Sequence, residues 1–276
     1  MRTDIFIVDL YNCLVKEIMT TNSDQNIFSL KGKTALVTGA SRGLGQSIAV
    51  GFAQAGADVI CCSSRVGGTD ETAALIEQLG RKAYCLAADL SQPEAVRSLV
   101  IQAYEKVSTI DVLVNNGGTI ARHPAVDFPL DEWNKVIDVN LNSVFLLCQL
   151  VGKKMLENKQ GKIINIASML SFQGGITVPA YTASKHGVVG ITKALANEWA
   201  ADNVQVNAIA PGYFRTDNTK ALQANPERNK DIEKRIPAGK WGEPSQIVGA
   251  VTFLATQASD YVNGHVLAVD GGWLAR

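Results

Sequence analysis

Tyr181 and Lys185 stand four residues apart in the stretch YTASK, and this pair is the first candidate for chemistry in the sequence. On a helix, residues at this spacing share a face, so the phenol and the ammonium would be neighbours. Lowering the pKa of a phenol from about 10 to about 7 requires roughly 4 kcal/mol. A cation about 4 Å away supplies roughly that much at an effective dielectric near 20, but only about 1 kcal/mol in bulk water. The pair can therefore exchange protons with a substrate only inside a cleft.

Two further polar residues strengthen the prediction of chemistry. Ser168 ends the apolar run KIINIAS ahead of Tyr181, and Asn140 lies in the stretch DVNL. We expect Ser168 to hydrogen-bond a substrate oxygen that Tyr181 protonates or deprotonates. The Asn140 amide can hold a helix backbone, or a water that relays protons to Lys185. A tyrosine and a lysine at helical spacing are, taken alone, a common surface pattern, so the prediction rests on the combination.

The elements that must position these residues alternate along the chain from residue 34 onward. Helical patterns separate seven apolar runs of strand length: TALVTG, ADVICCS, KAYCLAAD, DVLVNN, KIINIAS, VQVNAIA and HVLAVDG. Runs that are apolar on both faces are typical of a parallel sheet covered by helices on each side, and the alternation predicts right-handed crossovers. We therefore predict an α/β fold, a single-domain Rossmann-type, doubly wound parallel sheet of seven strands.

The sequence predicts one catalytic domain over residues 28–276, because this length is common for a doubly wound fold and no linker or repeat interrupts it. Residues 211–244 are rich in charge and proline, and we expect them to form a lid over the site. Residues 1–27 are expected to be an extension outside this domain, either because translation starts at Met19 or because the segment is an amphipathic docking helix. Two aspartates interrupt its apolar stretch and no small-residue cleavage site follows, which disfavours a signal peptide.

Composition excludes several classes of partner. The formal net charge is zero, so no basic field attracts a nucleic acid or an anionic membrane, and a small neutral or anionic ligand fits better. No uninterrupted apolar run reaches membrane-spanning length. Five cysteines without CxxC spacing and only three histidines leave few metal ligands. We expect reduced thiols, no metal site and a cytoplasmic location.

The stretch TGASRGLG follows the first predicted strand and opens a helix. Glycine costs helix stability, so three glycines here indicate a close backbone approach to the pyrophosphate of a dinucleotide at the helix N-terminus. A tight turn without a ligand is the alternative. The expected cofactor contacts in this loop are Gly39, Ser41, Arg42, Gly43, Leu44 and Gly45.

Further cofactor contacts are expected where other strands end, at the carboxyl edge of the sheet. Asp89 ends the third strand, where it can contact adenine or cap the next helix. The turn NNGG after the fourth strand is expected to face the ribose at Asn115. The second strand ends without the acid that would bind a ribose 2′-hydroxyl, and Ser64 with Arg65 suits a 2′-phosphate instead. Arg65 can equally be a solvated loop residue.

Over residues 28–276 this combination resembles the short-chain dehydrogenase/reductase family. The residues that carry the resemblance are TGASRGLG, NNGG, Asn140, Ser168, the YxxxK of Tyr181 and Lys185, and the stretch NAIAPG. The resemblance implies a catalytic tetrad in which Ser168 holds the carbonyl and Tyr181 is the general acid and base. Lys185 is implied to hold the nicotinamide ribose as well, and Asn140 completes the tetrad.

The resemblance also implies cofactor contacts at other motif positions. Thr216, beyond PGYFRT, is expected to meet the amide or the phosphates of the cofactor. Gly117 departs from the family's usual NNAG and puts the rigidity of this turn in doubt. The remaining implied contacts are Leu90, Asn116, Gly118, Tyr181, Lys185, Pro211 and Gly212.

The segments RIPAGKWGEP and ASDYVNGHVLAVDGGWLAR narrow the resemblance to a subgroup that oxidises or reduces deoxy sugar acids of the 2-dehydro-3-deoxy-D-gluconate type, mostly with NAD(H). NAD is therefore the expected cofactor and NADP the alternative. The family and the apolar-rich helices expected over 131–156 and 180–201 predict a homotetramer. The alternatives are a reductase of another ketone, such as a 3-oxoacyl group, and a non-catalytic cofactor-binding protein.

A sugar-acid substrate carries a carboxylate, which needs a cation and preferably the planar fork of an arginine. Arg122, in the loop after the fourth strand, is our preferred candidate, with a solvated arginine or an ion pair to Asp127 as alternatives. Arg215, in the expected lid, is the second candidate. The predicted substrate contacts are Ser168, Tyr181, Arg122 and Arg215.

Overall fold

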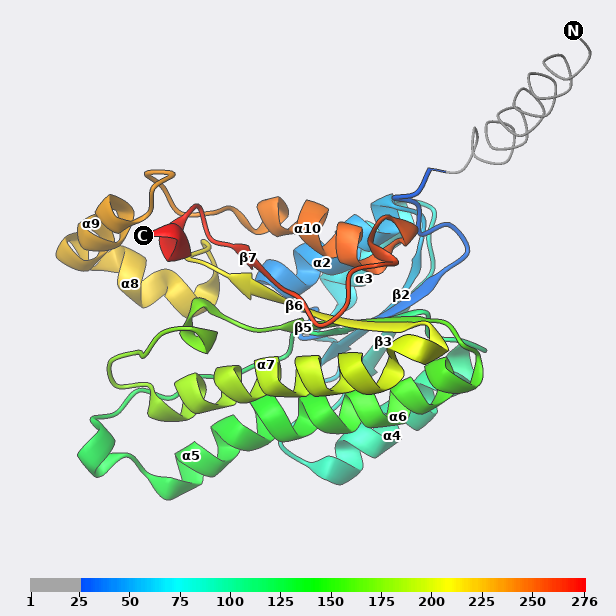
Figure 1. Cartoon of the computed structure of the whole chain (residues 1–276), viewed down its shortest axis with the longest axis horizontal. Coiled ribbons are helices and arrows are strands. Elements are labelled where there is room, and N and C mark those ends of the chain that lie inside the picture. Colours follow the sequence, from blue (N-terminus) through cyan, green and yellow to red (C-terminus); the bar gives the residue numbers. More distant parts are fainter. Residues whose placement is uncertain (1–25) are drawn as a thin grey trace, which may run out of the picture.

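Seven parallel strands form one sheet at the centre of the molecule (Figure 1). Their spatial order is β3-β2-β1-β4-β5-β6-β7, so the chain begins inside the sheet and builds outward in both directions. The strands are β1 (Thr34–Thr38), β2 (Asp58–Ser63), β3 (Ala83–Ala87), β4 (Val112–Asn115), β5 (Gly161–Ile166), β6 (Val204–Pro211) and β7 (Val266–Val269). The predicted Rossmann-type, doubly wound parallel sheet is confirmed.

This computed structural model describes residues 26–276. The predicted extension over residues 1–27 lies outside the described residues, apart from its last two positions.

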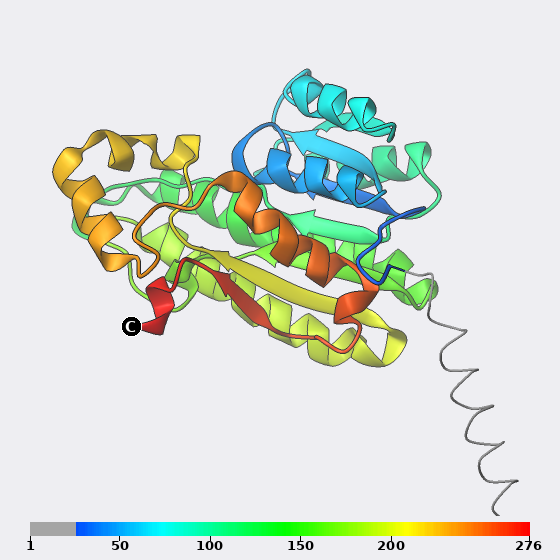
Figure 2. The same ribbon diagram turned by 90° about the horizontal axis from the view of Figure 1, so that it is seen from above.

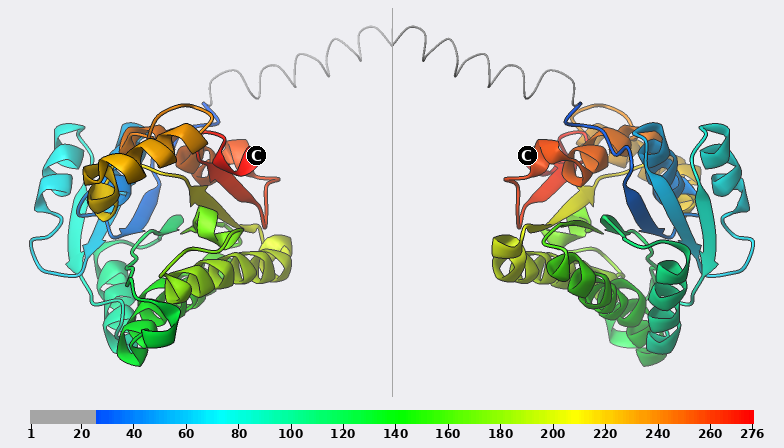
Figure 3. Two further views of the ribbon diagram at one scale, coloured as in Figure 1. Left: turned by 90° about the vertical axis from the view of Figure 1, so that its left-hand side faces the viewer. Right: turned by 90° about the vertical axis from the view of Figure 1, so that its right-hand side faces the viewer.

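Helices cover both faces of the sheet, as the views in Figures 2 and 3 show. One layer contains α2 (Gly43–Gln54), α3 (Asp70–Gln78) and α10 (Val248–Ala255); the other contains α4 (Pro93–Lys106), α5 (Leu130–Ile137), α6 (Ser143–Glu157) and α7 (Pro179–Trp199). Neighbouring side chains of a strand enter different cores. Leu36 packs with residues of α4, α6 and α7, whereas Val37 packs with residues of α2 and α10. Because both faces are covered, the strands read as continuous apolar runs.

The segment 211–244 extends beyond the carboxyl ends of the last strands and contains two helices, α8 (Lys220–Ala224) and α9 (Pro226–Arg235) (Figure 1). The side-chain oxygen of Asn225 accepts a hydrogen bond of 3.0 Å from the backbone N–H of Arg228 and so caps α9. Ile232 at the inner face of this helix packs in a small apolar cluster with Met169, Ile236, Trp241 and Trp273. The segment is thus anchored to the wall of the fold.

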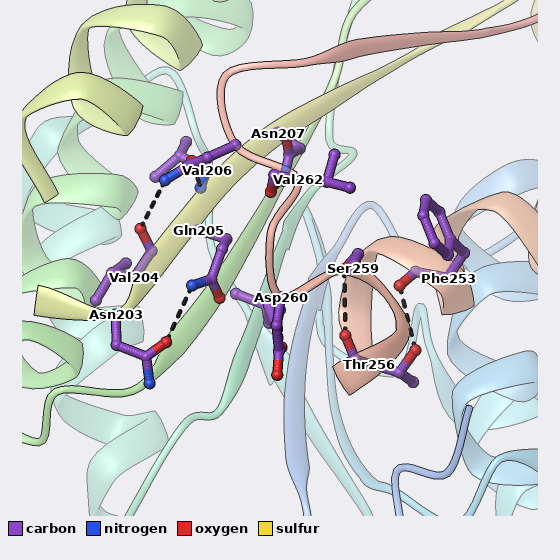
Figure 4. A network of polar contacts seen from close by, with 12 residues as sticks. Asn203, Val204, Gln205, Val206, Asn207, Phe253, Thr256, Ser259, Asp260 and Val262 are labelled. Atoms are coloured by element: carbon purple, nitrogen blue, oxygen red, sulfur yellow. Dashed lines mark hydrogen bonds and ion pairs between the residues drawn. The ribbon is translucent and has the colours of Figure 1, made fainter. Parts of the chain in front are cut away.

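Polar side chains hold the first half of β6 against the loop that precedes β7, away from the carboxyl edge of the sheet (Figure 4). The Asn207 side chain donates to the carbonyl of Val262 at 2.8 Å and accepts from the N–H of His265 at 2.9 Å. Lys162 forms an ion pair of 2.6 Å with Asp260. These contacts fix the connection that leads into β7.

Among residues 26–276, the run Leu130–Glu157 is the one helix that is long and apolar enough to cross a membrane, and 44% of its most apolar window is buried inside the protein. Its inner residues, including Val144, Leu147 and Val151, belong to the core beneath the sheet. Core packing therefore accounts for the apolar residues on the inner face of this run.

Candidate active site

A cavity of about 920 Å³ opens at the carboxyl edge of the sheet, between the strand ends and the segment 211–244. Most of the residues predicted to bind a cofactor or a substrate line it. They are Gly39, Ser41, Arg42, Gly43, Leu44, Gly45, Ser64, Asp89, Leu90, Asn116, Gly118, Arg122, Ser168, Tyr181, Lys185, Pro211, Gly212 and Thr216. Arg65, Asn140 and Arg215 are not among its lining residues.

The glycine loop between β1 and α2 leaves no room for side chains. Gly39 has a φ of +64°, and a Cβ atom there would lie 2.9 Å from the side-chain nitrogen of Asn116. A Cβ atom at Gly45 would overlap the carbonyl oxygen of Gly39. The first turn of α2 carries no acidic residue, and Arg42 forms no side-chain cap. The free backbone N–H groups in the first turn of α2 therefore suit an anionic ligand.

The turn after β4 differs from the sequence prediction at its first residue. Asn115 is buried, and its side chain donates to the Asn165 side chain at 2.8 Å. The prediction that Asn115 faces a ribose is therefore wrong, because the last side chain of the strand points into a helix layer. Asn116 lies at the cavity and donates to the carbonyl of Thr38 at 2.9 Å, which ties β4 to β1.

Gly117, the departure from the usual motif, has a neighbour that accounts for it. A Cβ atom at this position would lie 2.5 Å from a terminal methyl group of Leu90. The Leu90 side chain occupies the space that an alanine methyl group would need. The Leu90 side chain therefore packs against the turn at Gly117 in place of an alanine methyl group.

The end of β2 carries no acidic side chain, and Ser64 lies at the cavity. The Ser63 hydroxyl donates to the carbonyl of Arg65 at 2.8 Å and shapes this turn. The Arg65 side chain is exposed outside the cavity wall, so in this structure it is the solvated loop residue of our alternative interpretation. Ser64 is the residue of this pair that a ribose substituent can reach.

Asp89 stabilises the turn ahead of α4 without capping that helix, whose N-cap residue is Gln92. Its contact with adenine stays a prediction. Its carboxylate accepts hydrogen bonds from the N–H of Ser91 at 2.9 Å and from the Ser91 hydroxyl at 2.8 Å. These hydrogen bonds, the one to the backbone first, lower the pKa of Asp89. The same side chain lines the cavity, so a charged carboxylate stabilises the turn before α4 and remains available to a ligand.

The structure brings Ser168, Tyr181 and Lys185 together on one wall of the cavity. Ser168 follows β5, and its hydroxyl oxygen accepts from the N–H of Leu170 at 3.1 Å. The ammonium of Lys185 is buried, donates to the carbonyl of Ile166 at 2.5 Å and lies 5.6 Å from the ring centre of Tyr181. The end of β5 and the first turns of α7 thus position the three groups relative to one another.

The electrostatics of the pair differ from the sequence expectation. Burial raises the pKa of Tyr181, whereas a hydrogen bond with Ser168 and the positive charge of Arg122 lower it. Burial also lowers the pKa of Lys185 to about 8. The expectation that Lys185 depresses the pKa of the phenol is not reproduced, because burial is the largest cause and the charge that lowers this pKa is that of Arg122. The phenol therefore holds its proton at neutral pH.

Asn140 acts on the surroundings of these groups. It lies in a π-helical turn, Asp138–Asn142, which joins α5 to α6, and such turns are frequent at functional sites. Its side chain binds both the N–H and the carbonyl of Thr119, at 2.8 and 2.9 Å. It also donates to the Ser184 hydroxyl at 3.2 Å, and that hydroxyl donates to the carbonyl of Tyr181 at 2.7 Å. The side chain thus holds the loop backbone at Thr119 directly and reaches α7 only through the Ser184 hydroxyl. The water relay to Lys185 stays a prediction.

The two predicted carboxylate-binding arginines lie in different places. Arg122 lines the cavity and forms no ion pair with Asp127. Arg215 points elsewhere, because its guanidinium pairs with Glu243 at 3.1 Å and Glu233 at 3.9 Å. This geometry gives no support to Arg215 as a substrate contact, and that assignment stays a prediction.

Sequence reasoning missed several residues of the cavity wall. From α9 come Arg228, Asp231 and Arg235, and from elsewhere come Gln173 and Trp273. A usable signal was present in PERNKDIEKR, where the charged residues recur at intervals of three and four around the single buried Ile232. Treating this stretch as an irregular lid concealed that helical face.

Comparison with known proteins adds to this geometry. Residues 39–274 match the family model described as enoyl-(acyl carrier protein) reductase. The chain is 58% identical over 249 residues to the 2-dehydro-3-deoxy-D-gluconate 5-dehydrogenase of Bacillus subtilis, covering 90% of this chain and 97% of that relative.

Two solved structures are also similar. A putative 2-deoxy-D-gluconate 3-dehydrogenase from Agrobacterium tumefaciens with bound NADP is 52% identical, with a TM-score of 0.84, and the match covers 91% of this chain and 100% of that chain. A putative NAD(P)-dependent gluconate 5-dehydrogenase from Beutenbergia cavernae, also with bound NADP, is 49% identical, with a TM-score of 0.88 and the same coverage of 91% and 100%.

Replacing Lys185 by methionine should change how stability depends on pH. Burial lowers the pKa of Lys185 from 10.5 to about 8, so between these values unfolding takes up a proton and the unfolding free energy rises with pH. The wild type should gain about 2 kcal/mol on the variant between about pH 7 and pH 9.5. Urea unfolding at both pH values measures this gain.

The matched control is Lys193→Met, which removes an exposed lysine of the same helix and should produce no such gain. A free-energy difference between wild type and Lys185→Met that stays constant with pH would contradict the lowered pKa.

Proposed function

This chain is a member of the short-chain dehydrogenase/reductase family, and from this membership we propose that it transfers a hydride between a nicotinamide cofactor and a keto or hydroxy group of a sugar acid of the 2-dehydro-3-deoxy-D-gluconate type. The observation that carries the proposal is that Ser168, Tyr181 and Lys185 share a cavity with the glycine loop. The identity to a sugar-acid dehydrogenase over most of both chains supports the substrate class.

The cavity fits a dinucleotide. Its glycine loop excludes side chains at Gly39 and Gly45, and the uncapped start of α2 offers N–H groups to a pyrophosphate. Ser64, Asp89 and Leu90 would hold the adenosine end. The nicotinamide end would be held by the remaining lining residues of the prediction: Asn116, Gly118, Tyr181, Lys185, Pro211, Gly212 and Thr216. When bound, this cofactor supplies the hydride or accepts it.

The side chains of the protein supply the proton chemistry. The Ser168 hydroxyl donates a hydrogen bond to the reacting oxygen of the substrate and orients it. The hydroxyl of Tyr181 gives its proton to that oxygen in reduction and takes it back in oxidation. Arg122, whose charge favours the deprotonated phenol, contacts the substrate at this reacting end. Asn140 positions α7 and the loop at Thr119.

Replacing Tyr181 by phenylalanine tests this assignment. The ring still packs, but the proton-transferring hydroxyl is gone, so turnover should fall by at least about 10²-fold while the affinity for the reduced cofactor changes less than about twofold. Formation of reduced nicotinamide from 2-dehydro-3-deoxy-D-gluconate measures turnover, and a 3-oxoacyl thioester assayed in the reverse direction tests the other ketone class.

The matched control is Tyr104→Phe, since the Tyr104 hydroxyl in α4 is buried without a hydrogen-bond partner. It should keep full turnover. Activity of Tyr181→Phe within about tenfold of wild type would refute the proton-transfer role.

For the cofactor, we propose that the site accepts NADP(H) alongside the NAD(H) expected from the subgroup. The absence of an acid at the end of β2 supports this, because a carboxylate there would repel a 2′-phosphate. The bound NADP in two similar structures supports it as well. Ser64 lines the cavity at the end of β2, which supports it as the residue that meets the phosphate.

Introducing an acid at the end of β2 should weaken the binding of NADP(H) and spare that of NAD(H). In Ser64→Asp, the dissociation constant for NADPH should rise at least about tenfold, and that for NADH should stay within about threefold of wild type. Fluorescence titration with each reduced cofactor measures both constants. Ser64→Ala is the control for losing the hydroxyl alone, and an equal response of both cofactors to Ser64→Asp would count against a 2′-phosphate site at this position.

We further propose a homotetramer in the cytoplasm. Large apolar side chains stand exposed on the helical layer, among them Leu130 at 71% and Phe145 at 45%, and burying such surfaces between copies supports assembly. Reduced thiols suit a cytoplasmic location, and Cys61, Cys62, Cys85 and Cys148 are free.

Light scattering at micromolar concentration should give the mass of four copies of the 29.5 kDa chain. Phe145→Glu should lower that mass, because it places a charge in the apolar surface. Val66→Glu, at a position 92% exposed in the loop after β2, should leave the mass unchanged. A wild-type chain that scatters as a stable monomer would rule the assembly out.

A further inference from the structure

One side of the cavity carries positive charge for which the proton chemistry has no use. It is formed by α9 and by the C-terminal turn Trp273–Ala275, which lie beside each other (Figure 1). Arg228, Asp231 and Arg235 from α9 line the cavity there. The guanidinium carbon of Arg235 lies 4.0 Å from the ring centre of Trp273. This stacked arginine is the feature that needs an explanation.

The indole under Arg235 is rigidly held. Trp273 is only 5% exposed, and its ring N–H donates to the Gln173 side chain at 3.0 Å. The Asp270 carboxylate accepts hydrogen bonds from the N–H groups of Gly272 and Leu274 at 2.9 and 2.8 Å, which fixes the turn that carries the indole. The guanidinium therefore rests on a surface that is already ordered.

The backbone of Arg235 is held from the same turn. The Arg276 guanidinium donates to the carbonyls of Lys234 and Arg235, each at 2.7 Å. These carbonyls end α9 and would otherwise lack partners, and a cation at a helix C-terminus is favourable. The position of Arg235 is thus set by both its side chain and its main chain.

The charge of Arg235 is left for a ligand. Whereas Arg215 is paired with two glutamates, Arg235 forms no ion pair with a carboxylate within residues 26–276, Asp231 one turn away included. A guanidinium stacked by its face keeps its N–H groups free at the edge, where a carboxylate can bind with both oxygens. The positive charge of α9 also acts on the phenol of Tyr213. Burial raises the pKa of Tyr213, and the charges of Arg228 and Arg235 lower it.

The geometry of the substrate separates the roles of the two arginines. Arg122 lines the cavity together with Tyr181, and its charge lowers the pKa of that phenol, so we place it at the reacting end. In a 2-dehydro-3-deoxy-D-gluconate reacting at C5, four carbon–carbon bonds of about 1.5 Å separate the reacting carbon from the carboxylate, a reach of roughly 5 Å. The carboxylate can therefore bind a cation other than the one beside the reacting oxygen, and Arg235 lines the same cavity.

We propose that Arg235, stacked on Trp273, binds the carboxylate of the sugar-acid substrate and so selects acids over neutral sugars. The assignment rests on the proposed function and moves the carboxylate from Arg122, where the sequence analysis placed it, to the wall formed by α9 and the C-terminal turn. Arg122 keeps the reacting end.

The test is equilibrium binding to the full-length protein saturated with NADPH, which cannot accept a hydride from the C5 hydroxyl, by calorimetry, with 2-dehydro-3-deoxy-D-gluconate and its neutral carboxamide as probes. In Arg235→Gln, affinity for the acid should fall about 10- to 100-fold, the loss of a charged hydrogen-bond pair, and affinity for the amide less than about threefold. Arg235→Lys, which keeps the charge but loses the fork, should recover part of the affinity for the acid. Lys230→Gln, which removes an exposed charge from the same helix outside the cavity, should leave both affinities unchanged.

Three results with the variants would overturn the assignment. They are unchanged acid binding in Arg235→Gln, an equal loss for acid and amide, and a loss of the preference for the acid in Arg122→Gln instead. Failure of wild type to bind the acid at all would also overturn it. Binding of the acid that depends on Arg235, without any turnover by wild type, would support the carboxylate site while refuting the proposed reaction, so the two failures are distinguishable.

Discussion

The contact on which the site depends is the close approach of the glycine loop to the end of β4. Gly45 lies so near the carbonyl of Gly39 that no side chain fits between them, and the Asn116 side chain binds the carbonyls of both Thr38 and Gly39. This contact fastens β1 to β4, which are neighbours in the sheet although two strands separate them in sequence. The crossovers on either side of this pair run in opposite directions, and a cavity opens between them. The start of α2 and the catalytic wall thereby face one ligand.

The cavity wall that carries the candidate catalytic residues Ser168, Tyr181 and Lys185 shows how burial positions side chains and how it disfavours their charged forms. Lys185 is held between β5 and the turn after it, because its ammonium donates to Ile166 and its carbonyl accepts from the Ser171 hydroxyl at 2.7 Å. The same burial disfavours both the charged lysine and the charged phenol. Burying these two titratable groups therefore lowers the stability of the folded protein. Such shifted pKa values cluster at functional sites, so a site with this cost is expected where proton transfer takes place.

The sequence predicted most of this because much of it depends on local pattern. Strands buried on both faces produce continuous apolar runs, and glycine spacing reports a turn that admits no side chain. The errors arise where a side-chain direction depends on packing. Asn115 could not be oriented without knowing which helix layer receives the last residue of β4. Arg215 and Arg235 are both lid arginines, and only the helical phase of α9 and its seat on the C-terminal turn decide which one enters the cavity. The electrostatics of Tyr181 required the degree of burial, which charge spacing does not give.

The cavity wall proposed to bind the carboxylate, formed by α9 and the turn Trp273–Ala275, comes from segments far apart in the chain. The sheet joins these segments. β6 leads into the segment with α9, and β7 leads into the turn with Trp273, so the pairing of these two strands sets the distance between guanidinium and indole. Their exits are pressed together at Gly212, where a Cβ atom would lie 2.5 Å from the Cα atom of Asp270. The catalytic wall belongs instead to β5 and α7. Because the residues proposed for proton transfer and for substrate recognition lie on separate elements, the recognised acid can change through α9 and the last residues of the chain while Ser168, Tyr181 and Lys185 stay in place.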